Sequence, residues 1–291
     1  MSSEPTNTSV TVTESRVSQT VAAVKALLST KKGALSIGLL VPIIFGVVAA
    51  PFIAPYPPTE THVIDRLTSP SFQYLLGTDQ YGRDVFSRIL YGGRASLLIG
   101  LGSTAFALAL GVPIGIVSGY SGGRFDELTM RAMDVLMSIP SLLLALLVVT
   151  GLGSGLTNTI IAIGIVFTPR LARITRSSTL SIKNQEYITA AEARGESLFR
   201  IAFYEILPNA SSSILVEGSI RIGFGILIGS SLSFLGLGTQ PPNPDWGYMA
   251  SVARNHLRSQ IWFMLGPGIA LGGTILGFNL LGDALRDYLE E

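Results

Sequence analysis

The sequence predicts an all-α integral membrane protein with six transmembrane helices. Of its 291 residues, 48% are hydrophobic, only 13% are charged and 32 are glycine. Soluble domains carry about 25% charged residues, and small residues let membrane helices pack closely. The chain also contains a series of apolar runs of the length that crosses a bilayer, about 20 residues. Because the hydrocarbon interior holds no water, each run must satisfy its own backbone hydrogen bonds and therefore forms a helix.

Six apolar runs come close to this length. The third run has the least clearly marked first residue. It is short unless it begins near Val135, which places the stretch before Pro140 partly in the membrane. A brief glycine-rich turn, 151–155, joins the third run to the fourth. The expected spans are roughly 34–54, 96–118, 139–152, 157–171, 214–237 and 261–281.

Residues 1–32 precede the first span and differ from it in composition. They are rich in Ser, Thr and Val, without an apolar core behind a basic head, so they are not expected to be a cleaved signal peptide. We expect a mostly disordered cytoplasmic tail that ends in a short helix over about 21–32. Residues 33–291 then form the six-helix transmembrane domain.

The distribution of Lys and Arg predicts the orientation, since cytoplasmic loops are enriched in both. With the N-terminus inside, thirteen basic residues are cytoplasmic and six are external. The cytoplasmic set is Arg16, Lys25, Lys31, Lys32, Arg124, Arg131, Arg170, Arg173, Arg176, Lys183, Arg194, Arg200 and Arg286. The external set is Arg66, Arg83, Arg88, Arg94, Arg254 and Arg258. Both termini are therefore expected in the cytoplasm, with outer loops at about 55–95 and 238–260.

The polar loop at about 173–208 carries the clearest functional pattern. Helix-forming residues end at Gly195, which is suited to a left-handed helix end, and Ser197 can cap a second helix that finishes before Pro208. A helix–glycine–helix loop of this length is typical of a docking surface. The alternative is a surface hairpin that binds nothing. The residues expected to carry docking are Glu186, Thr189, Ala190, Ala191, Arg194, Gly195, Leu198, Leu207 and Pro208.

Motifs for nucleotide or metal chemistry are missing. The sequence has no G-x-x-x-x-G-K-[ST] and no H-E-x-x-H. It has no cysteine, and its two histidines, His62 and His256, are far apart in the chain. We therefore expect no catalytic site, no cofactor, no metal and no nucleic-acid partner.

Four blocks of the chain resemble one transporter family. Ala190-Ala191, Gly195 and Leu207-Pro208 match the EAA loop of permease subunits of bacterial ABC importers, with Thr189 at the family's glutamate position and Glu205 at an isoleucine position. The other blocks are 76–88, 119–134 and 233–247, and they resemble the dipeptide, oligopeptide and nickel branch. The order of the blocks is similar to that of the C-type subunit in a pair of unlike permeases.

The resemblance implies a mechanism and a set of partners. A separate cytoplasmic ATPase would bind the coupling helices at 185–205, and an extracytoplasmic binding protein would deliver a peptide to the outer loops. The channel would lie between this subunit and a homologous second permease in the plasma membrane, surrounded by lipid. Nickel complexes and glutathione-like solutes remain alternative substrates. A secondary transporter and a non-transporting scaffold remain alternative classes, separable by co-purification with an ATPase.

Charged and aromatic residues near the spans allow two interpretations each. Glu217 and Arg221 are spaced i,i+4 inside the fifth span, so they either form an ion pair within the helix or line the pathway or its gate. Trp246 and Tyr248 are membrane-interface anchors or docking contacts. The remaining polar residues are interpreted as structural tethers or ligands: Arg83, Asp84, Arg88, Asn279 and Asp283.

Overall fold

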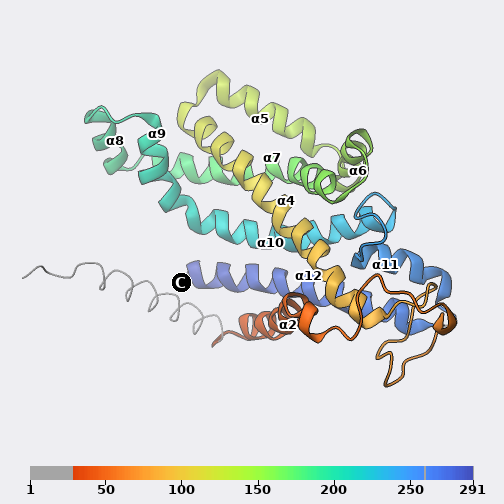
Figure 1. The fold of residues 1–291 in the computed structure, drawn as a ribbon. Helices are drawn as coiled ribbons and strands as arrows, with labels where there is room; N and C mark the ends of the chain where they lie inside the picture. Colours follow the sequence, from red (N-terminus) through yellow and green to blue (C-terminus); the bar gives the residue numbers. More distant parts are fainter. Residues whose placement is uncertain (1–28, 259, 291) are drawn as a thin grey trace, which may run out of the picture.

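The computed structural model describes residues 29–258 and 260–290, and helices dominate this part of the chain (Figure 1). No β-strand forms within these residues. The expected tail over residues 1–32, with its short helix at 21–32, lies almost wholly outside the described residues. In chain order the elements are α2 (Lys31–Val48), α3 (Ala50–Ile53), η1 (Val63–Asp65), α4 (Val85–Ser121), α5 (Gly123–Met137), α6 (Ser141–Leu152), α7 (Leu156–Lys183), α8 (Glu186–Ala193), α9 (Leu198–Arg200), η2 (Ile201–Ile206), α10 (Leu207–Phe234), α11 (Trp246–Ala253), η3 (Arg254–His256) and α12 (Ile261–Glu290).

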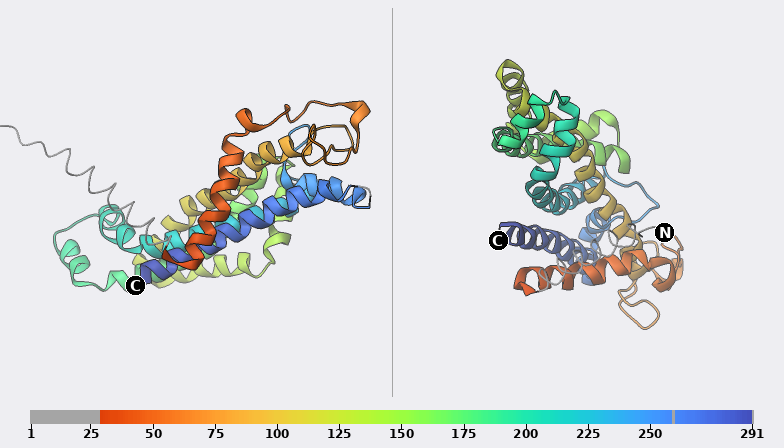
Figure 2. Two further views of the ribbon diagram at one scale, coloured as in Figure 1. Left: turned by 90° about the horizontal axis from the view of Figure 1, so that it is seen from below. Right: turned by 90° about the vertical axis from the view of Figure 1, so that its left-hand side faces the viewer.

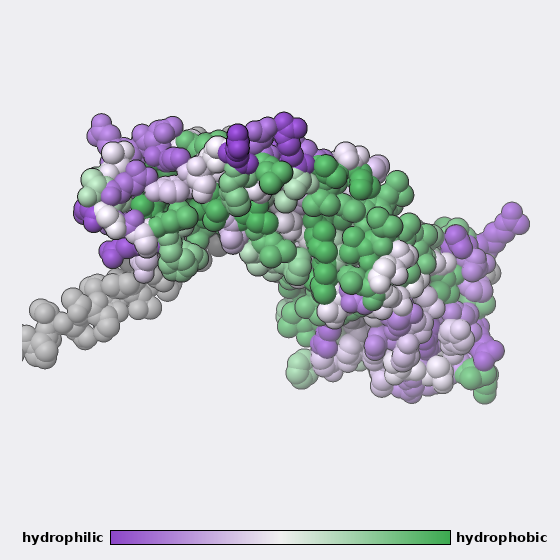
Figure 3. Space-filling view, turned by 90° about the horizontal axis from the view of Figure 1, so that it is seen from above, coloured by the Kyte–Doolittle hydropathy of each residue, from purple (hydrophilic) through white to green (hydrophobic). Residues whose placement is uncertain are grey.

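The long helices form an elongated bundle with two distinct ends. α4 crosses α7 and α10, and α12 packs against α2 and α10. Figures 1 and 2 place α8, α9 and the end of α12 at one end of the bundle, and α11 with the segment before α4 at the other. Figure 3 shows a broad hydrophobic surface between more hydrophilic ends, which is the pattern of a chain embedded in a bilayer.

Within the part of the chain that the structure describes, four helices are long and apolar enough to cross a membrane: Lys31–Val48, Val85–Ser121, Leu198–Phe234 and Ile261–Leu289. The pair α5–α6 adds a fifth if it is taken as one broken span, because its two axes are bent by 92°. The third predicted span, 139–152, corresponds to α6, and the alternative start near Val135 would include the bend between α5 and α6. α7 contains the fourth predicted run, 157–171, but Arg170 lies near the end of that run and Arg173 just after it, and both lower its mean hydropathy. Six spans remain a prediction.

Several predicted boundaries were wrong because polar residues inside helices concealed the helix ends. α4 begins at Val85, eleven residues before the predicted start, since its first turns carry Arg88 and Arg94. The outer loop therefore ends at Asp84, whose side chain accepts a hydrogen bond from the Ser87 N–H. α7 likewise continues to Lys183, so the first residues of the segment predicted as a loop from about 173 are helical.

A stripe of small residues on α4 brings it close to α7. A β-carbon at Gly111, Gly115 or Gly119 would lie 2.9, 2.4 or 3.0 Å from backbone oxygens of α7. These distances are too short for any side chain, so the four-residue spacing of the glycines sets how closely the two backbones approach. The close contact fixes α7 and the loop that follows it relative to α4.

Trp246, expected at a membrane interface or docking surface, is instead buried at the outer end of the bundle. It is 1% exposed, lies in a hydrophobic cluster with Val47 and Leu97, and donates from Nε1 to the carbonyl of Ile89 at 2.8 Å. The absence of a side chain at Gly93 makes room for its ring. Trp246 therefore joins α2, α4 and α11.

Trp246→Ala should destabilise the protein by about 3–5 kcal/mol, because it leaves a cavity and an unpaired carbonyl. The measurement is the thermal melting temperature of the purified protein in detergent. Trp262→Ala is the matched control, since Trp262 is 48% exposed and should melt near the wild-type temperature. Equal melting temperatures for the two variants would contradict the buried role of Trp246.

Candidate functional site

The helix–glycine–helix segment predicted from the sequence is present at the end of the bundle where α12 finishes. α8 ends in a Schellman motif, in which Gly195 has φ +75°, its N–H donates to the Glu192 carbonyl, and the Glu196 N–H donates to the Ala191 carbonyl. Ser197 then caps α9 by accepting a hydrogen bond from the Arg200 N–H at 3.4 Å. The positions expected to stop and restart the helix are therefore confirmed.

One face of this segment packs inside the protein. Ile188 and Ala191 of α8 are fully buried in a cluster with Ile116 of α4 and Ile201 and Ile206 of η2. Ala191, expected to enter a groove of a partner, cannot do so because the protein's own side chains enclose it. Its small size serves the packing of α8 on α4 and η2.

The other face is exposed and rich in aromatic residues. The rings of Phe199 and Phe203 stack with their centroids 4.5 Å apart, and Phe199 and Tyr204 are 70% and 73% exposed. Contiguous exposed apolar surface of this kind marks an interaction site. We call it the α8–η2 face, and its exposed residues are Glu186, Tyr187, Thr189, Ala190, Ala193, Arg194, Leu198, Phe199, Phe203, Tyr204 and Pro208.

Polar contacts attach α8 to the end of α4. The Tyr120 hydroxyl donates to Glu192 Oε1 at 2.6 Å, and Lys183 Nζ donates to the Tyr120 carbonyl while lying 5.3 Å from the Tyr120 ring centroid. Tyr120 could not be predicted as a partner of α8, because nothing along the chain relates it to a residue 72 positions later. A movement of α8 would thus act directly on α4.

The predicted break before Pro208 does not occur. Residues Ile201–Ile206 form a π-helix, and the Leu207 N–H bonds to the Ala202 carbonyl five residues earlier. Proline lacks the N–H of an ordinary helical turn, and π-bulges are frequent at functional sites. Pro208 lies in the first turn of α10, where that N–H is not needed, so a single long helix runs from Leu198 to Phe234.

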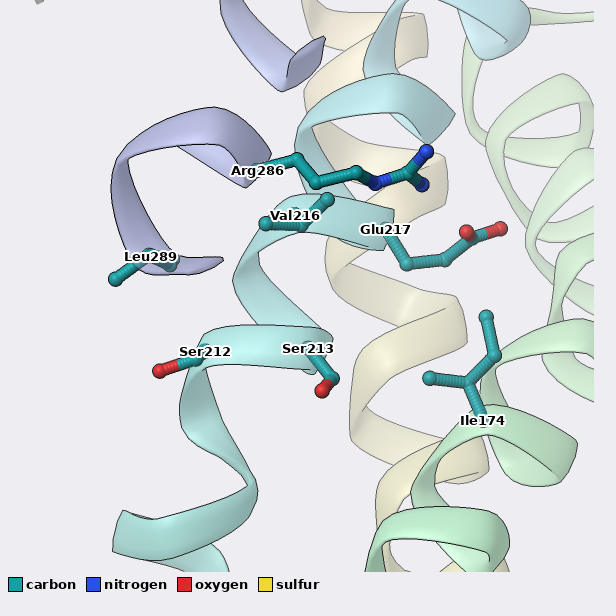
Figure 4. A pocket seen from close by; sticks show the side chains of 7 residues that line it. All are labelled: Ile174, Ser212, Ser213, Val216, Glu217, Arg286 and Leu289. Carbon is teal, nitrogen blue, oxygen red and sulfur yellow. The ribbon is translucent and has the colours of Figure 1, made fainter. Parts of the chain in front are cut away.

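Two cavities lie along α10. The inner one, of about 250 Å³, is lined by α7, α10 and α12 through Ile174, Ser212, Ser213, Val216, Glu217, Arg286 and Leu289 (Figure 4). The outer one, of about 400 Å³, is mostly apolar and is lined from α6, α10, α11 and α12, including Leu142, Phe234 and Ile275. Since α10 and α12 line both, we call this surface the α10 groove.

The charged residues predicted in the fifth span pair with each other, and Glu217 of the pair lines the inner cavity of the α10 groove. Arg221 Nε donates to Glu217 Oε1 at 2.7 Å, which confirms the i,i+4 ion pair. Arg170 of α7 approaches the same oxygen at 3.5 Å, a partner that sequence spacing could not indicate. The Arg221 guanidinium also lies over the rings of Phe167 and Phe224, at 5.4 and 5.5 Å. Glu217 therefore joins α7 to α10.

The outer charged block forms structural tethers. Asp79 accepts hydrogen bonds from Arg83 Nε at 2.6 Å and from the backbone N–H groups of Tyr81 and Arg83. Arg88, 2% exposed, donates to the Pro58 carbonyl at 2.6 Å. These buried contacts hold the segment before α4 against the start of that helix.

Asp245 and Tyr74 hold the rest of the outer surface. Asp245 caps α11 by accepting from the Tyr248 N–H at 3.1 Å, and burial raises the pKa of its carboxyl although the hydrogen bonds it accepts oppose this shift. Burial and the hydrogen bond from Tyr74 to Asp65 raise the pKa of Tyr74 to about 12. Both groups stabilise the outer loops rather than presenting charge to solvent.

Comparisons with known proteins agree with this architecture. The family "Binding-protein-dependent transport system inner membrane component" matches residues 111–291. A solved structure, "Inward facing conformations of the MetNI methionine ABC transporter", has a TM-score of 0.57 at 16% identity, covering 69% of this chain and 96% of that chain. At that identity the likeness concerns the fold alone.

Curated relatives are closer in sequence. The Di/tripeptide transport system permease protein DppC of Pseudomonas aeruginosa (strain UCBPP-PA14) is 42% identical over 267 residues, covering 89% of this chain and 88% of that protein. The Dipeptide transport system permease protein DppC of Alkalihalophilus pseudofirmus is 41% identical over 269 residues, covering 91% and 88%. The Glutathione transport system permease protein GsiD of Pectobacterium atrosepticum is 43% identical over 242 residues, covering 83% and 80%. The chain belongs to the family of binding-protein-dependent transport system inner membrane components.

Proposed function

We propose that this chain is a transmembrane permease subunit of an ATP-driven importer that moves di- or oligopeptides across the plasma membrane. The observation that carries the proposal is the similarity, at about 40% identity over most of the chain, to proteins named as dipeptide permeases. The chain itself is a translocation subunit, and ATP hydrolysis belongs to a separate partner.

The ATPase partner would dock on the α8–η2 face. That face combines exposed aromatic rings with Arg194 and Arg200, and its buried side is fixed to α4 through Tyr120 and Ile116. Pressure on Phe199 would reach α4 by these contacts and α10 through the continuous helix from Leu198. The coupling residues predicted from the sequence thus act in two ways, with Ala190 and Arg194 on the docking side and Ala191 on the packing side.

The proposed topology has six spans with both termini in the cytoplasm. It counts α5–α6 as one broken span and α7 as another. The apolar part of α7, 157–171, would cross the membrane, and the arginines after it would lie on the cytoplasmic side, where Arg173 pairs with Asp134 and Arg176 with Asp126. The excess of basic residues near α8 and the end of α12 supports a cytoplasmic position for that end.

Single cysteines should report this topology, because the chain has no native cysteine. Cysteine at Thr59 or Asn243 should react with an impermeant thiol reagent added to intact cells. Cysteine at Ser197 should react only after the membrane is opened. All three positions are exposed, so burial does not confuse the comparison. The reverse pattern of labelling would refute the orientation and the coupling assignment together.

The α10 groove is proposed to form one wall of the pathway. Glu217 and Arg221 are the charged residues of that wall. A groove on one subunit needs a second wall, which a homologous permease would provide. An extracytoplasmic binding protein would release substrate at the outer end. An apolar groove of about 960 Å³ between α4 and the α9–η2 segment adjoins the α8–η2 face, and Leu198, Phe199 and Phe203 belong to both.

The test of the proposed function is reconstitution of the importer with its ATPase, second permease and binding protein in proteoliposomes. ATP inside and binding protein outside should together drive uptake of dialanine, and omission of ATP should abolish it. Uptake driven by a proton gradient without ATP would indicate a secondary transporter. Glutathione should be tested as a competitor, since a relative named for glutathione transport is 43% identical, and nickel complexes should be tested beside it.

A further inference from the structure

We propose that the inner part of the α10 groove binds the C-terminal carboxylate of the transported peptide, through Arg170 and Arg286. This inference rests on the proposed function and specifies the part of the substrate that is recognised. The α-carboxylate is the one anionic group that every unmodified peptide carries, so its recognition is independent of peptide sequence.

The first argument is an imbalance of charge. Arg170 and Arg221 share the single carboxylate of Glu217, at 3.5 Å and 2.7 Å. Arg286 enters the same region from α12, and Figure 4 shows its guanidinium directed to the side of α10 from which Glu217 projects. Arg170 and Arg221 thus contact Glu217, and Arg286 lines the same cavity as Glu217, so three positive charges lie near one carboxylate and a second anion would be attracted.

Nearby carboxylates of α12 do not correct this imbalance. Asp287 pairs with Lys32 of α2 at 2.7 Å, and Asp283 also interacts electrostatically with Lys32. Among the side chains that the structure describes, which do not include that of Glu290, no carboxylate forms an ion pair with Arg286. The positive charge thus remains on the cavity side of α12.

The second argument is the availability of hydrogen-bond donors. A guanidinium has five N–H donors in a planar fork that suits a carboxylate. Arg221 is largely covered by Phe167, Phe224 and Glu217, and only 18% of its side chain is exposed. Arg170 is 51% exposed and contacts Glu217 through Nε, so its other donors stay open to a ligand.

The third argument is the shape of the cavity. Its volume of about 250 Å³ is several times the roughly 30 Å³ that one water occupies in the liquid. Ser212 and Ser213 add hydroxyl groups to its wall, while Ile174, Val216 and Leu289 add apolar surface (Figure 4). A carboxylate at the arginines would leave the adjacent peptide side chain against these apolar residues.

The test compares dialanine with dialanine amide, which lacks the carboxylate. The assembled importer, without binding protein, is placed in phosphatidylcholine nanodiscs, and binding of each labelled peptide is measured by equilibrium dialysis. The wild type should bind dialanine about tenfold more tightly, the effect expected of one charge-assisted hydrogen bond. Arg170→Gln and Arg286→Gln should each reduce this preference, and Arg286→Lys should retain part of it.

Arg173→Gln is the matched control, because Arg173 lies on α7 with a similar exposure of 45% but pairs with Asp134 of α5. It should keep the wild-type preference. Equal binding of the two peptides by the wild type would overturn the inference, and so would an unchanged preference in Arg286→Gln.

Nanodiscs that contain phosphatidylglycerol test the other source of an anion. If this lipid displaces dialanine from the wild type but not from Arg286→Gln, the site binds a lipid phosphate and the peptide assignment is wrong. ATP-driven dialanine uptake in proteoliposomes is measured in parallel. Uptake without discrimination would defeat only this inference, whereas absence of uptake would defeat the proposed function.

Discussion

Glu217→Leu should remove most of the detergent-stable protein. Glu217 is 6% exposed, and among the described residues it is the one carboxylate that pairs with both Arg170 and Arg221. Its loss would leave Arg221 beside two phenylalanine rings with no counter-charge. Breaking a buried pair in this way typically costs roughly 3–5 kcal/mol, which is a large share of the stability of a folded domain. The measurement is the yield and melting temperature of purified protein.

Replacing either arginine should lower the protein yield less than replacing Glu217 does. The two arginine variants should also differ from each other in yield. Arg221→Leu leaves Glu217 with Arg170, so its loss should be smaller than that of Glu217→Leu. Arg170→Leu should be mildest, because Arg170 is half exposed and Glu217 keeps its closer partner. The double variant Glu217→Leu/Arg221→Leu should recover much of the yield, since it strands no fully buried charge. Wild-type yield from Glu217→Leu would mean that these charges face water, as in a hydrated pathway.

The same helix connects this cluster with the proposed docking surface. The helix is continuous from Leu198 to Phe234, so Phe199 and Glu217 belong to the same helix. Their separation of eighteen residues corresponds to about 27 Å along a helix. The π-helical turn at Ile201–Ile206 lies between them and is the one irregular section of that path. A displacement at the ATPase surface would therefore reach the groove along α10.

Local patterns in the sequence predicted the features that depend on neighbours in the chain. The left-handed Gly195, the capping Ser197 and the pair Glu217–Arg221 were all found, because each interaction spans four residues or fewer. Arg170 as a third partner could not be predicted, since it comes from a different helix. The helix periodicity of α8 was also insufficient to show which face is buried.

Errors in the helix boundaries have a similar cause. Arg88 lies in the first turn of α4 but is paired with a carbonyl of another segment, so its charge wrongly suggested a loop. Pro208 suggested a break, but the π-helical turn before it removed the need for one. Trp246 was predicted at a membrane interface, but its ring fits in the interior because Gly93 has no side chain there. In each case a tertiary contact overrode a local preference.

Ala190→Trp and Ala191→Trp should both lose transport, but for different reasons, although the two residues are adjacent. Ala191 is fully buried against Ile116, Ile188 and Ile206, so tryptophan there should force α8 away from α4. Ala190 is exposed on the α8–η2 face, so tryptophan there should leave the fold intact and obstruct the ATPase. Both variants should lose ATP-driven uptake of dialanine.

Two measurements on the purified permease separate these causes. Ala191→Trp should lower the melting temperature, because overpacking a core costs about 1–3 kcal/mol, whereas Ala190→Trp should melt as the wild type does. Co-purification of the ATPase should fail for Ala190→Trp even though its permease is stable. Thr189→Ala is the control on the exposed side, since it removes a hydroxyl without adding bulk and should bind the ATPase. If Ala190→Trp retains both the ATPase and transport, the α8–η2 face is not where the ATPase docks, and the burial of Ala191 has only a structural role.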